Sequence, residues 1–168
     1  MMQAKFDVNI TVKDLYAFLI NNTYRKFTGV LWVVFSIFCI GVGIYTLNDV
    51  KVTSTILLFL AAAFFLILNP ILLYSKAKNQ VKKNKYFSET LSYTIDEKGI
   101  TVSQAGEQAN VKWEEMWKTV RYGNIVVVYV TTIRAFILPV ESMGDQYNTV
   151  VELAFKGLGA RNHLRKKK

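Results

Sequence analysis

Two long uncharged apolar stretches constrain this chain more than any other feature. Residues 27–48 and residues 52–75 contain no charged side chain. An α-helix rises about 1.5 Å per residue, so about 20 apolar residues cross the hydrocarbon core of a bilayer. Buried helices of soluble proteins are usually shorter and interrupted by polar residues. The sequence therefore predicts a transmembrane helical hairpin at residues 27–75, with spans at 27–48 and 52–75.

Basic residues around the two spans predict their orientation. Because only residues 48–51 link the spans, both outer ends of the hairpin must lie on the same side of the membrane. The link carries one lysine and one aspartate, whereas many basic side chains flank the outer ends. These are the side chains of Arg25, Lys26, Lys76, Lys78, Lys82, Lys83 and Lys85. By the positive-inside rule, both termini are expected in the cytoplasm, with the protein in the cytoplasmic membrane.

The basic linker at residues 76–86 follows the second span directly. Its lysines are candidate contacts with anionic lipid headgroups, since each cation near such a surface contributes about 1 kcal/mol. The five candidates are Lys76, Lys78, Lys82, Lys83 and Lys85. The positive-inside rule alone also requires basic residues here. The net charge of +9 is thus first a signal of topology, and no nucleic-acid partner is expected because the basic residues form no recognisable binding motif.

Residues 87–160 are expected to form an α+β cytoplasmic domain. Short stretches of alternating apolar and polar residues, and one continuous apolar run at residues 125–130, are separated by turns, as in antiparallel strands. Gly99 is expected to adopt a positive φ in one of these turns. The expected strands lie at residues 91–95, 100–103, 111–113, 117–122, 125–130 and 135–138. A helix should follow between Gly144 and Gly157, with Asp145 as its cap and Gly157 or Gly159 at its end. This order predicts a small antiparallel barrel or sheet capped by a C-terminal helix.

The first 26 residues are predicted to contain a strand followed by an amphipathic helix. Apolar and polar residues alternate from Phe6 to Thr11, and Thr11 with Asp14 resembles a capping box. A single strand cannot satisfy its own backbone groups, so we expect it to pair with the sheet of residues 87–140. Alternatively, residues 1–27 form only an interfacial amphipathic helix.

Within the spans, the residue types favour an anchor. No ionisable residue lies at mid-membrane, where a transporter or channel would need one. The alanines at 61–63 are expected to let the two helices approach closely. At Asn69–Pro70 the sequence predicts a kink with a freed backbone carbonyl, because proline has no N–H to donate.

Side chains suited to catalysis are scarce. The single histidine, His163, lies in the basic tail at residues 161–168, and the single cysteine, Cys39, lies inside the first span. Glu114 and Glu115 are adjacent, and neighbours on a strand point to opposite faces. The sequence therefore predicts no catalytic, cofactor-binding or metal site, and no enzyme.

Two tryptophans and the C-terminal tail each leave two interpretations open. Trp113 and Trp117 are expected in the core, with the Trp113 ring packed on the strand at residues 125–130; the alternative is insertion at the membrane interface. The tail at Arg165–Lys168 either adds a second membrane contact or remains solvated.

The order of four short motifs points to a known family. Gly99-Ile100, Gly106, Trp113 and Leu138-Pro139 follow one another behind the predicted hairpin. This layout resembles the YcxB-like family of small bacterial membrane proteins over nearly the whole chain. The resemblance implies a pleckstrin-homology-like (PH-like) C-terminal domain and supplies no activity. Glu141 departs from the family pattern, in which a basic residue is commoner at this place, and so argues against an anion site there.

Two classes of function follow. In the first, the hairpin anchors a PH-like domain that docks a protein, a peptide or lipid headgroups at the inner face of the membrane. In the second, the hairpin itself acts as a structural component, as a subunit of a complex or as a homo-oligomeric pore. A pore needs a polar stripe, and the spans offer only Ser36, Thr46, Ser54, Thr55 and Asn69.

Overall fold

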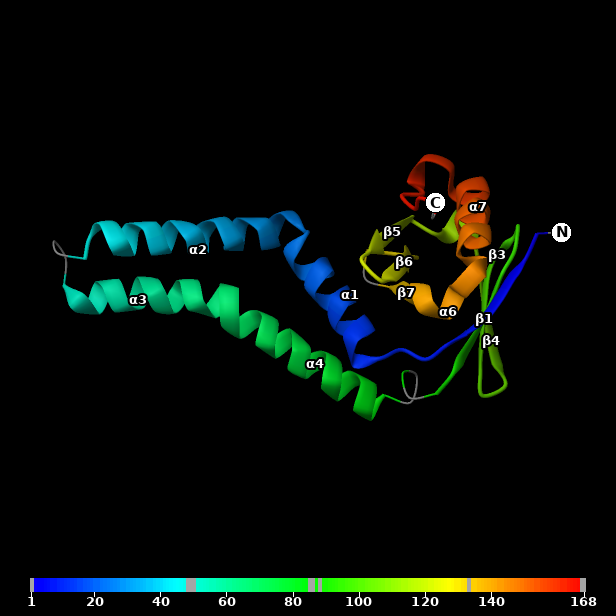
Figure 1. Ribbon diagram of the computed structural model, residues 1–168, viewed down its shortest axis with the longest axis horizontal. Helices are drawn as coiled ribbons and strands as arrows, with labels where there is room; N and C mark the ends of the chain where they lie inside the picture. Colours follow the sequence, from blue (N-terminus) through cyan, green and yellow to red (C-terminus); the bar gives the residue numbers. More distant parts are fainter. Residues whose placement is uncertain (1, 48–50, 85–86, 88, 133, 167–168) are drawn as a thin grey trace. The chain divides into compact units, whose positions relative to one another are not determined.

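The computed structural model describes residues 2–47, 51–84, 87, 89–132 and 134–166 of the protein. The chain divides into two compact units. One combines Met1–Phe18 with Asn79–Lys168 and is called the β unit below, and the other, Leu19–Lys78, is called the helical unit. The β unit is thus built from both ends of the chain, with the helical unit inserted between them (Figure 1).

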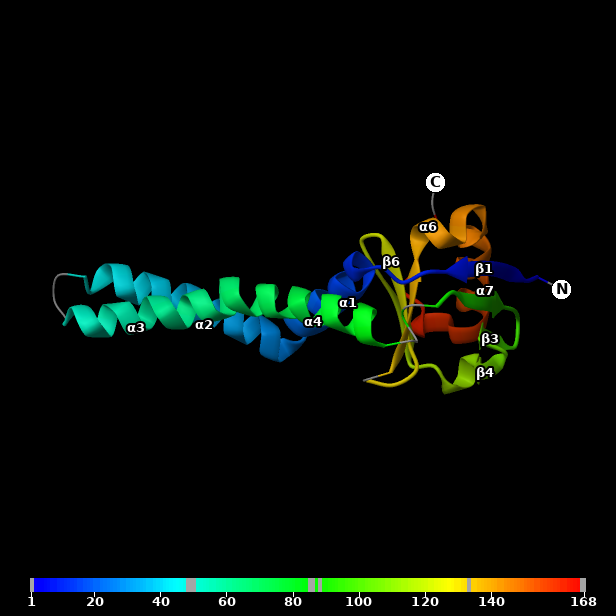
Figure 2. The same cartoon turned by 90° about the horizontal axis from the view of Figure 1, so that it is seen from below.

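The helical unit contains two helices that lie side by side, α2 (Phe27–Tyr45) and α3 (Val52–Ala63) (Figure 2). The predicted first span at 27–48 is therefore helical to Tyr45, and residues 48–50 of the link lie outside the described residues. The second predicted span, 52–75, is part of a longer helical stretch, Val52–Lys83. Both α2 and this stretch are long and apolar enough to cross a membrane.

Small residues line the contact between α2 and α3. The buried residues of α2 are Gly29, Ser36, Cys39 and Gly43, and those of α3 are Thr55 and Ala62. Gly29 lies against the backbone of Thr23 and Tyr24 at the end of α1 and not against α3. At Gly43 an added Cβ would lie 3.2 Å from the Phe59 ring, so the helices approach closely where side chains are small. Of the three alanines expected at this contact, only Ala62 is buried.

A π-helical turn, Phe64–Leu68, separates α3 from α4 (Asn69–Lys83). The Asn69 N–H donates to the Phe64 carbonyl, and Pro70 has no N–H for the Phe65 carbonyl. The Tyr24 hydroxyl donates to that Phe65 carbonyl instead, at 2.6 Å, and the Asn69 amide donates to Tyr24 Oη at 3.1 Å. The freed carbonyl expected near Pro70 is present, and a side chain of the helical unit satisfies it.

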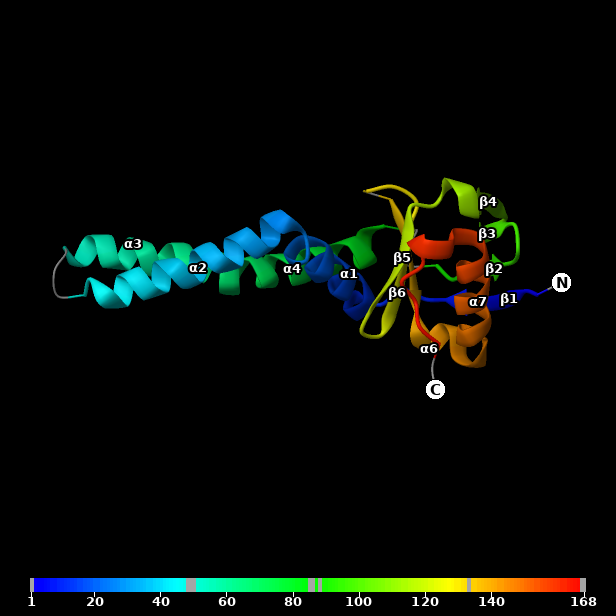
Figure 3. The same ribbon diagram turned by 90° about the horizontal axis from the view of Figure 1, so that it is seen from above.

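The β unit contains two antiparallel sheets, which appear as separate layers (Figure 3). The first has the order β1-β2-β3-β4, with β1 at Ala4–Val8, β2 at Leu91–Ile95, β3 at Gly99–Gln104 and β4 at Glu107–Lys112. The second has the order β5-β6-β7, with β5 at Lys118–Tyr122, β6 at Ile125–Tyr129 and β7 at Ala135–Pro139. All six strands expected between residues 91 and 138 are present. They form two sheets, because the 3-10 turn Trp113–Glu115 interrupts the chain between β4 and β5.

Strand β1 pairs with β2 in antiparallel register, from Ala4 opposite Ile95 to Val8 opposite Leu91. The N-terminal strand thus joins the C-terminal sheet as expected, although it begins earlier and ends before Thr11. The backbone N–H of Thr11 donates to the Asp14 carboxylate at 3.0 Å, and the Asp14 N–H donates to Thr11 Oγ1 at 3.3 Å. This capping box, predicted from the sequence, opens α1 (Val12–Tyr24).

The C-terminal helix forms where helical spacing predicted it, as α7 (Tyr147–Leu158) after the short helix α6 (Val140–Met143). The expected cap at Asp145 is wrong: α7 follows a 3-10 turn, and its N-cap Gln146 makes no side-chain capping bond. Gly159 ends the helix with φ +55°, a left-handed conformation that favours glycine.

Two glycines of the β unit are required by close contact and have no positive φ. A Cβ at Gly157, inside α7, would lie 2.2 Å from Cγ of the Trp113 ring. A Cβ at Gly99 would lie 2.2 Å from the Val111 carbonyl oxygen. The positive φ expected at Gly99 is therefore wrong, and the glycine is needed because β4 passes too close for a side chain.

The core of the β unit lies between its two sheets and α7. Strand β6 is buried along its whole length, and Tyr93 of β2 meets Phe136 of β7 with ring centroids 6.0 Å apart. Six residues of α7 are also buried: Tyr147, Val150, Val151, Leu153, Ala154 and Leu158. The apolar face predicted for this helix is the face that closes the core.

Candidate functional site

Four of the five predicted headgroup contacts lie on α4 and are exposed: Lys76, Lys78, Lys82 and Lys83. Lys85 lies outside the described residues. At 100° per residue, Lys76 and Lys83 share one side of α4, and Lys78 and Lys82 share the opposite side. The lysines therefore surround the helix and do not converge on one pocket.

Trp113 and Trp117, for which the sequence predicted the same two alternatives, have different environments. Trp113 is 3% exposed, its ring lies against Gly157 of α7, and its Nε1–H donates to the Asp96 carbonyl at 2.9 Å. Its expected burial is confirmed, whereas its packing against β6 stays a prediction. Trp117 is 46% exposed and lies just before β5. Trp113 is thus a core residue, and Trp117 presents nearly half of its surface to the surroundings.

Trp117 belongs to a cluster of aromatic rings and one lysine, called the Trp117 cluster below. Its members are Trp117, Lys118, Tyr129 and Phe18. The Trp117 and Tyr129 rings meet edge to face with centroids 6.1 Å apart, and the Lys118 ammonium lies 4.2 Å from the Trp117 ring centroid. Burial, together with the side-chain hydrogen bond between Tyr129 and Tyr122, raises the pKa of Tyr129 far above its ordinary value. Tyr129 therefore remains a neutral ring that supports the cluster.

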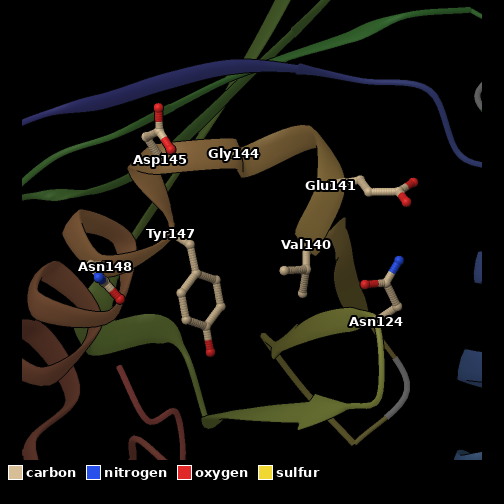
Figure 4. Close-up of a pocket in the computed structure, with 7 residues that line it drawn as sticks. All are labelled: Asn124, Val140, Glu141, Gly144, Asp145, Tyr147 and Asn148. Carbon is tan, nitrogen blue, oxygen red and sulfur yellow. The ribbon is translucent and has the colours of Figure 1, made fainter. Parts of the chain in front are cut away.

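A pocket of about 470 Å³ lies beside the start of α7 (Figure 4). It is lined by Asn124, Val140, Glu141, Gly144, Asp145, Tyr147 and Asn148. Figure 4 shows the Glu141 and Asp145 side chains pointing away from each other. The Tyr147 hydroxyl donates to the Arg165 carbonyl at 2.9 Å. These carboxylates are not paired for acid–base chemistry, and their negative charge does not suit an anion.

The other residues considered for chemistry occur in three different segments of the chain. Glu114 and Glu115 occur in the turn after β4, where the Glu115 carboxylate accepts the Lys112 backbone N–H at 3.3 Å. Cys39 is buried in α2, and the His163 backbone N–H donates to the Thr119 carbonyl. Among the described residues, no group of three or more His, Cys, Asp or Glu could hold a metal ion.

The C-terminal tail is ordered as far as the structure describes it. Asn162 forms a parallel bridge with Thr119 of β5, and Leu164 is buried. Arg161 donates to the Met116 carbonyl at 2.7 Å, and Lys166 pairs with Glu152 of α7. Of the segment Arg165–Lys168, for which the sequence left a membrane contact and a solvated tail open, Arg165 and Lys166 are exposed, and Lys167–Lys168 lie outside the described residues. Leu164, a lone apolar residue among basic ones, is the one sequence signal of this contact.

One family comparison bears on the β unit. Residues 95–154 match the family model of the YcxB-like protein. The match confirms the resemblance expected from the motifs, and it runs from the end of β2 into α7. It does not include the helical unit or β1. No significant match to a curated protein or to a solved structure was found.

Proposed function

We propose that this protein is an integral protein of the bacterial cytoplasmic membrane, in which the hairpin of residues 27–75 anchors a PH-like cytoplasmic domain. The observation that carries the proposal is the exposure of large apolar side chains along both long helices. They include Phe27, Leu31, Phe38, Leu57, Leu60 and Ile67. Each 100 Å² of apolar surface in water costs about 2.5 kcal/mol, a cost that lipid removes. A core helix of a soluble protein would bury these side chains.

In this proposal, the PH-like domain docks a protein or a lipid-headgroup partner at the inner face of the membrane. Two small antiparallel sheets closed by a C-terminal helix support the PH-like assignment, as does the YcxB-like match. The exposed lysines of α4 favour an anionic surface nearby. The proposed function is binding; catalysis is not proposed.

The polar residues of the spans favour an anchor over a pore. Ser36 Oγ donates to the Trp32 carbonyl, and Thr46 Oγ1 donates to the Val42 carbonyl, each within its own helix. Thr55 is buried in the helical unit, and Asn69 donates to Tyr24. Ser54 is the exposed member of the set. These side chains offer no continuous polar stripe for a lumen.

Reporter fusions at Lys51 and at the C-terminus test the topology. Alkaline phosphatase, which is active only outside the cytoplasm, should be active at Lys51 and inactive at the C-terminus. A fluorescent protein that folds only in the cytoplasm should give the reverse pattern. Resistance of the full chain to alkaline carbonate extraction tests integration. A phosphatase active at the C-terminus, or extraction by carbonate, contradicts the proposal.

A further inference from the structure

Trp117 is one of two large apolar side chains exposed on the described part of the β unit, the other being Phe155. The two differ in their neighbours. Phe155 is 65% exposed on α7, beside Glu152 and Lys156 of the same helix. Trp117 is held by a backbone bond from its N–H to the Tyr129 carbonyl, at 2.7 Å, and by its edge-to-face contact with the Tyr129 ring. The exposed half of Trp117 is therefore presented in a fixed position.

Lys118 places a positive charge directly on this exposed ring. Its ammonium lies 4.2 Å from the Trp117 centroid and 5.6 Å from the Tyr129 centroid. An indole beside an ammonium joins two side-chain groups that favour the membrane interface. Tryptophan is enriched at headgroup depth, and lysine is attracted to anionic lipid phosphate.

The Trp117 cluster is also joined by contact to the segment that leads into the hairpin. The Phe18 ring of α1 lies 6.3 Å from the Tyr129 ring. From Phe18, α1 continues for six residues, about 9 Å, to Tyr24, and α2 begins at Phe27. Only a short length of chain therefore separates the cluster from the first residue of the candidate span.

We propose that Trp117 and Lys118 form a membrane-contact site for the anionic phospholipid surface in which the hairpin is embedded. The indole inserts at headgroup depth, and the Lys118 ammonium meets lipid phosphate. The inference rests on the proposed anchoring of residues 27–75. Lipid suits this site because the site presents one exposed ring beside one positive charge. The contact would fix the orientation of the β unit at the bilayer.

Quenching of tryptophan fluorescence by brominated lipids tests this site in the full chain. The protein is reconstituted in vesicles containing one third phosphatidylglycerol, with bromines either near the headgroups or deep in the acyl chains. Subtracting the signal of Trp117→Phe isolates Trp117, and subtracting that of Trp32→Phe isolates Trp32 of α2. We expect shallow bromines to quench Trp117 at least twofold more than deep ones. Lys118→Glu should reduce this quenching at least twofold. Lys156→Glu, the same change at an exposed lysine of α7 that pairs with Glu97, should not.

Each outcome of this test is decisive. If Trp32 is not quenched by bromines of either depth, the protein is not embedded and the proposed function itself fails. If Trp32 is quenched while Trp117 is reached only by aqueous acrylamide, the membrane-contact site is wrong and the anchor stands. If Trp117 is shielded from both bromines and acrylamide, a protein covers it and the lipid assignment is overturned. The same loss of quenching in Lys156→Glu would refute a specific role of Lys118.

Discussion

Replacement of Trp113 by alanine is expected to destabilise the β unit strongly. The ring is 3% exposed, so its removal leaves a cavity between α7 and the turn that follows β4. Truncation of a buried tryptophan costs about 3–5 kcal/mol. Part of this cost is the bond from Nε1–H to the Asp96 carbonyl, since a typical hydrogen bond contributes about 1 kcal/mol. Trp117→Ala is the matched control, and it should cost less than about 2 kcal/mol because that ring is 46% exposed.

Gly157→Ala probes the same contact from α7. Its Cβ would lie 2.2 Å from the Trp113 ring, so the ring or the helix must move. Overpacking of this kind costs about 1–3 kcal/mol. In the double variant Trp113→Ala with Gly157→Ala, the ring that clashes is absent. The two losses of unfolding free energy should therefore not add. The double variant should lose at least about 1 kcal/mol less than the sum of the losses in the two single variants.

Amide hydrogen exchange of the full chain in detergent micelles measures these effects without relying on tryptophan fluorescence. Protection in β2, β6 and α7 reports the stability of the β unit, and protection in α2 serves as an internal reference. If Trp113→Ala changes protection no more than Trp117→Ala does, Trp113 is not a core residue. Additive costs in the double variant would show that Gly157 is not required by the ring.

Three further predictions concern other contacts. Phe6→Asp, which puts a charge at a buried position of β1, should remove exchange protection from both β1 and β2; protection kept in β2 would show that the sheet is complete without β1. Tyr24→Phe removes the donor to the Phe65 carbonyl and should cost the helical unit about 1 kcal/mol in denaturant titrations, whereas an unchanged midpoint would show that the carbonyl needs no partner. Lys166 lowers the pKa of Glu152 below its ordinary value, so the contribution of this pair is present above a pH of about 4.3 and is lost as the pH falls through the lowered pKa. Proteolysis of the tail should therefore accelerate in acid in the wild type, and a Glu152→Gln variant that shows the same acceleration would refute this cause.

Local patterns in the sequence predicted the secondary structure well. The uncharged stretches predicted two long helices, and short apolar or alternating stretches bounded by turns predicted a strand at or near each of β2 to β7. The Thr11–Asp14 capping box and the end of α7 at Gly159 also follow from residue types at fixed spacing. These features depend on interactions within a few residues, or on the general solvation of apolar side chains.

Long-range contacts decided the rest. Trp113 and Trp117 are four residues apart and equally apolar, yet only Trp113 is covered, because Gly157 of α7 leaves space for its ring. The requirement for glycine at position 99 comes from the path of β4 and not from a turn conformation. The burial of Leu164 follows the parallel bridge that Asn162 forms with Thr119 of β5.

The candidate membrane-contact site shows the same division. The order of residues in the sequence already places basic residues beside the spans and identifies Trp113 and Trp117 as candidates for the core or the membrane interface. Only the fold brought Phe18 of α1 against Tyr129 of β6, 111 positions later in the chain, and left the indole of Trp117 uncovered beside Lys118. Which side chain remains exposed is set by the packing of distant segments. The residues next to a side chain in the sequence do not determine its burial, since burial depends on the residues that the fold packs around it.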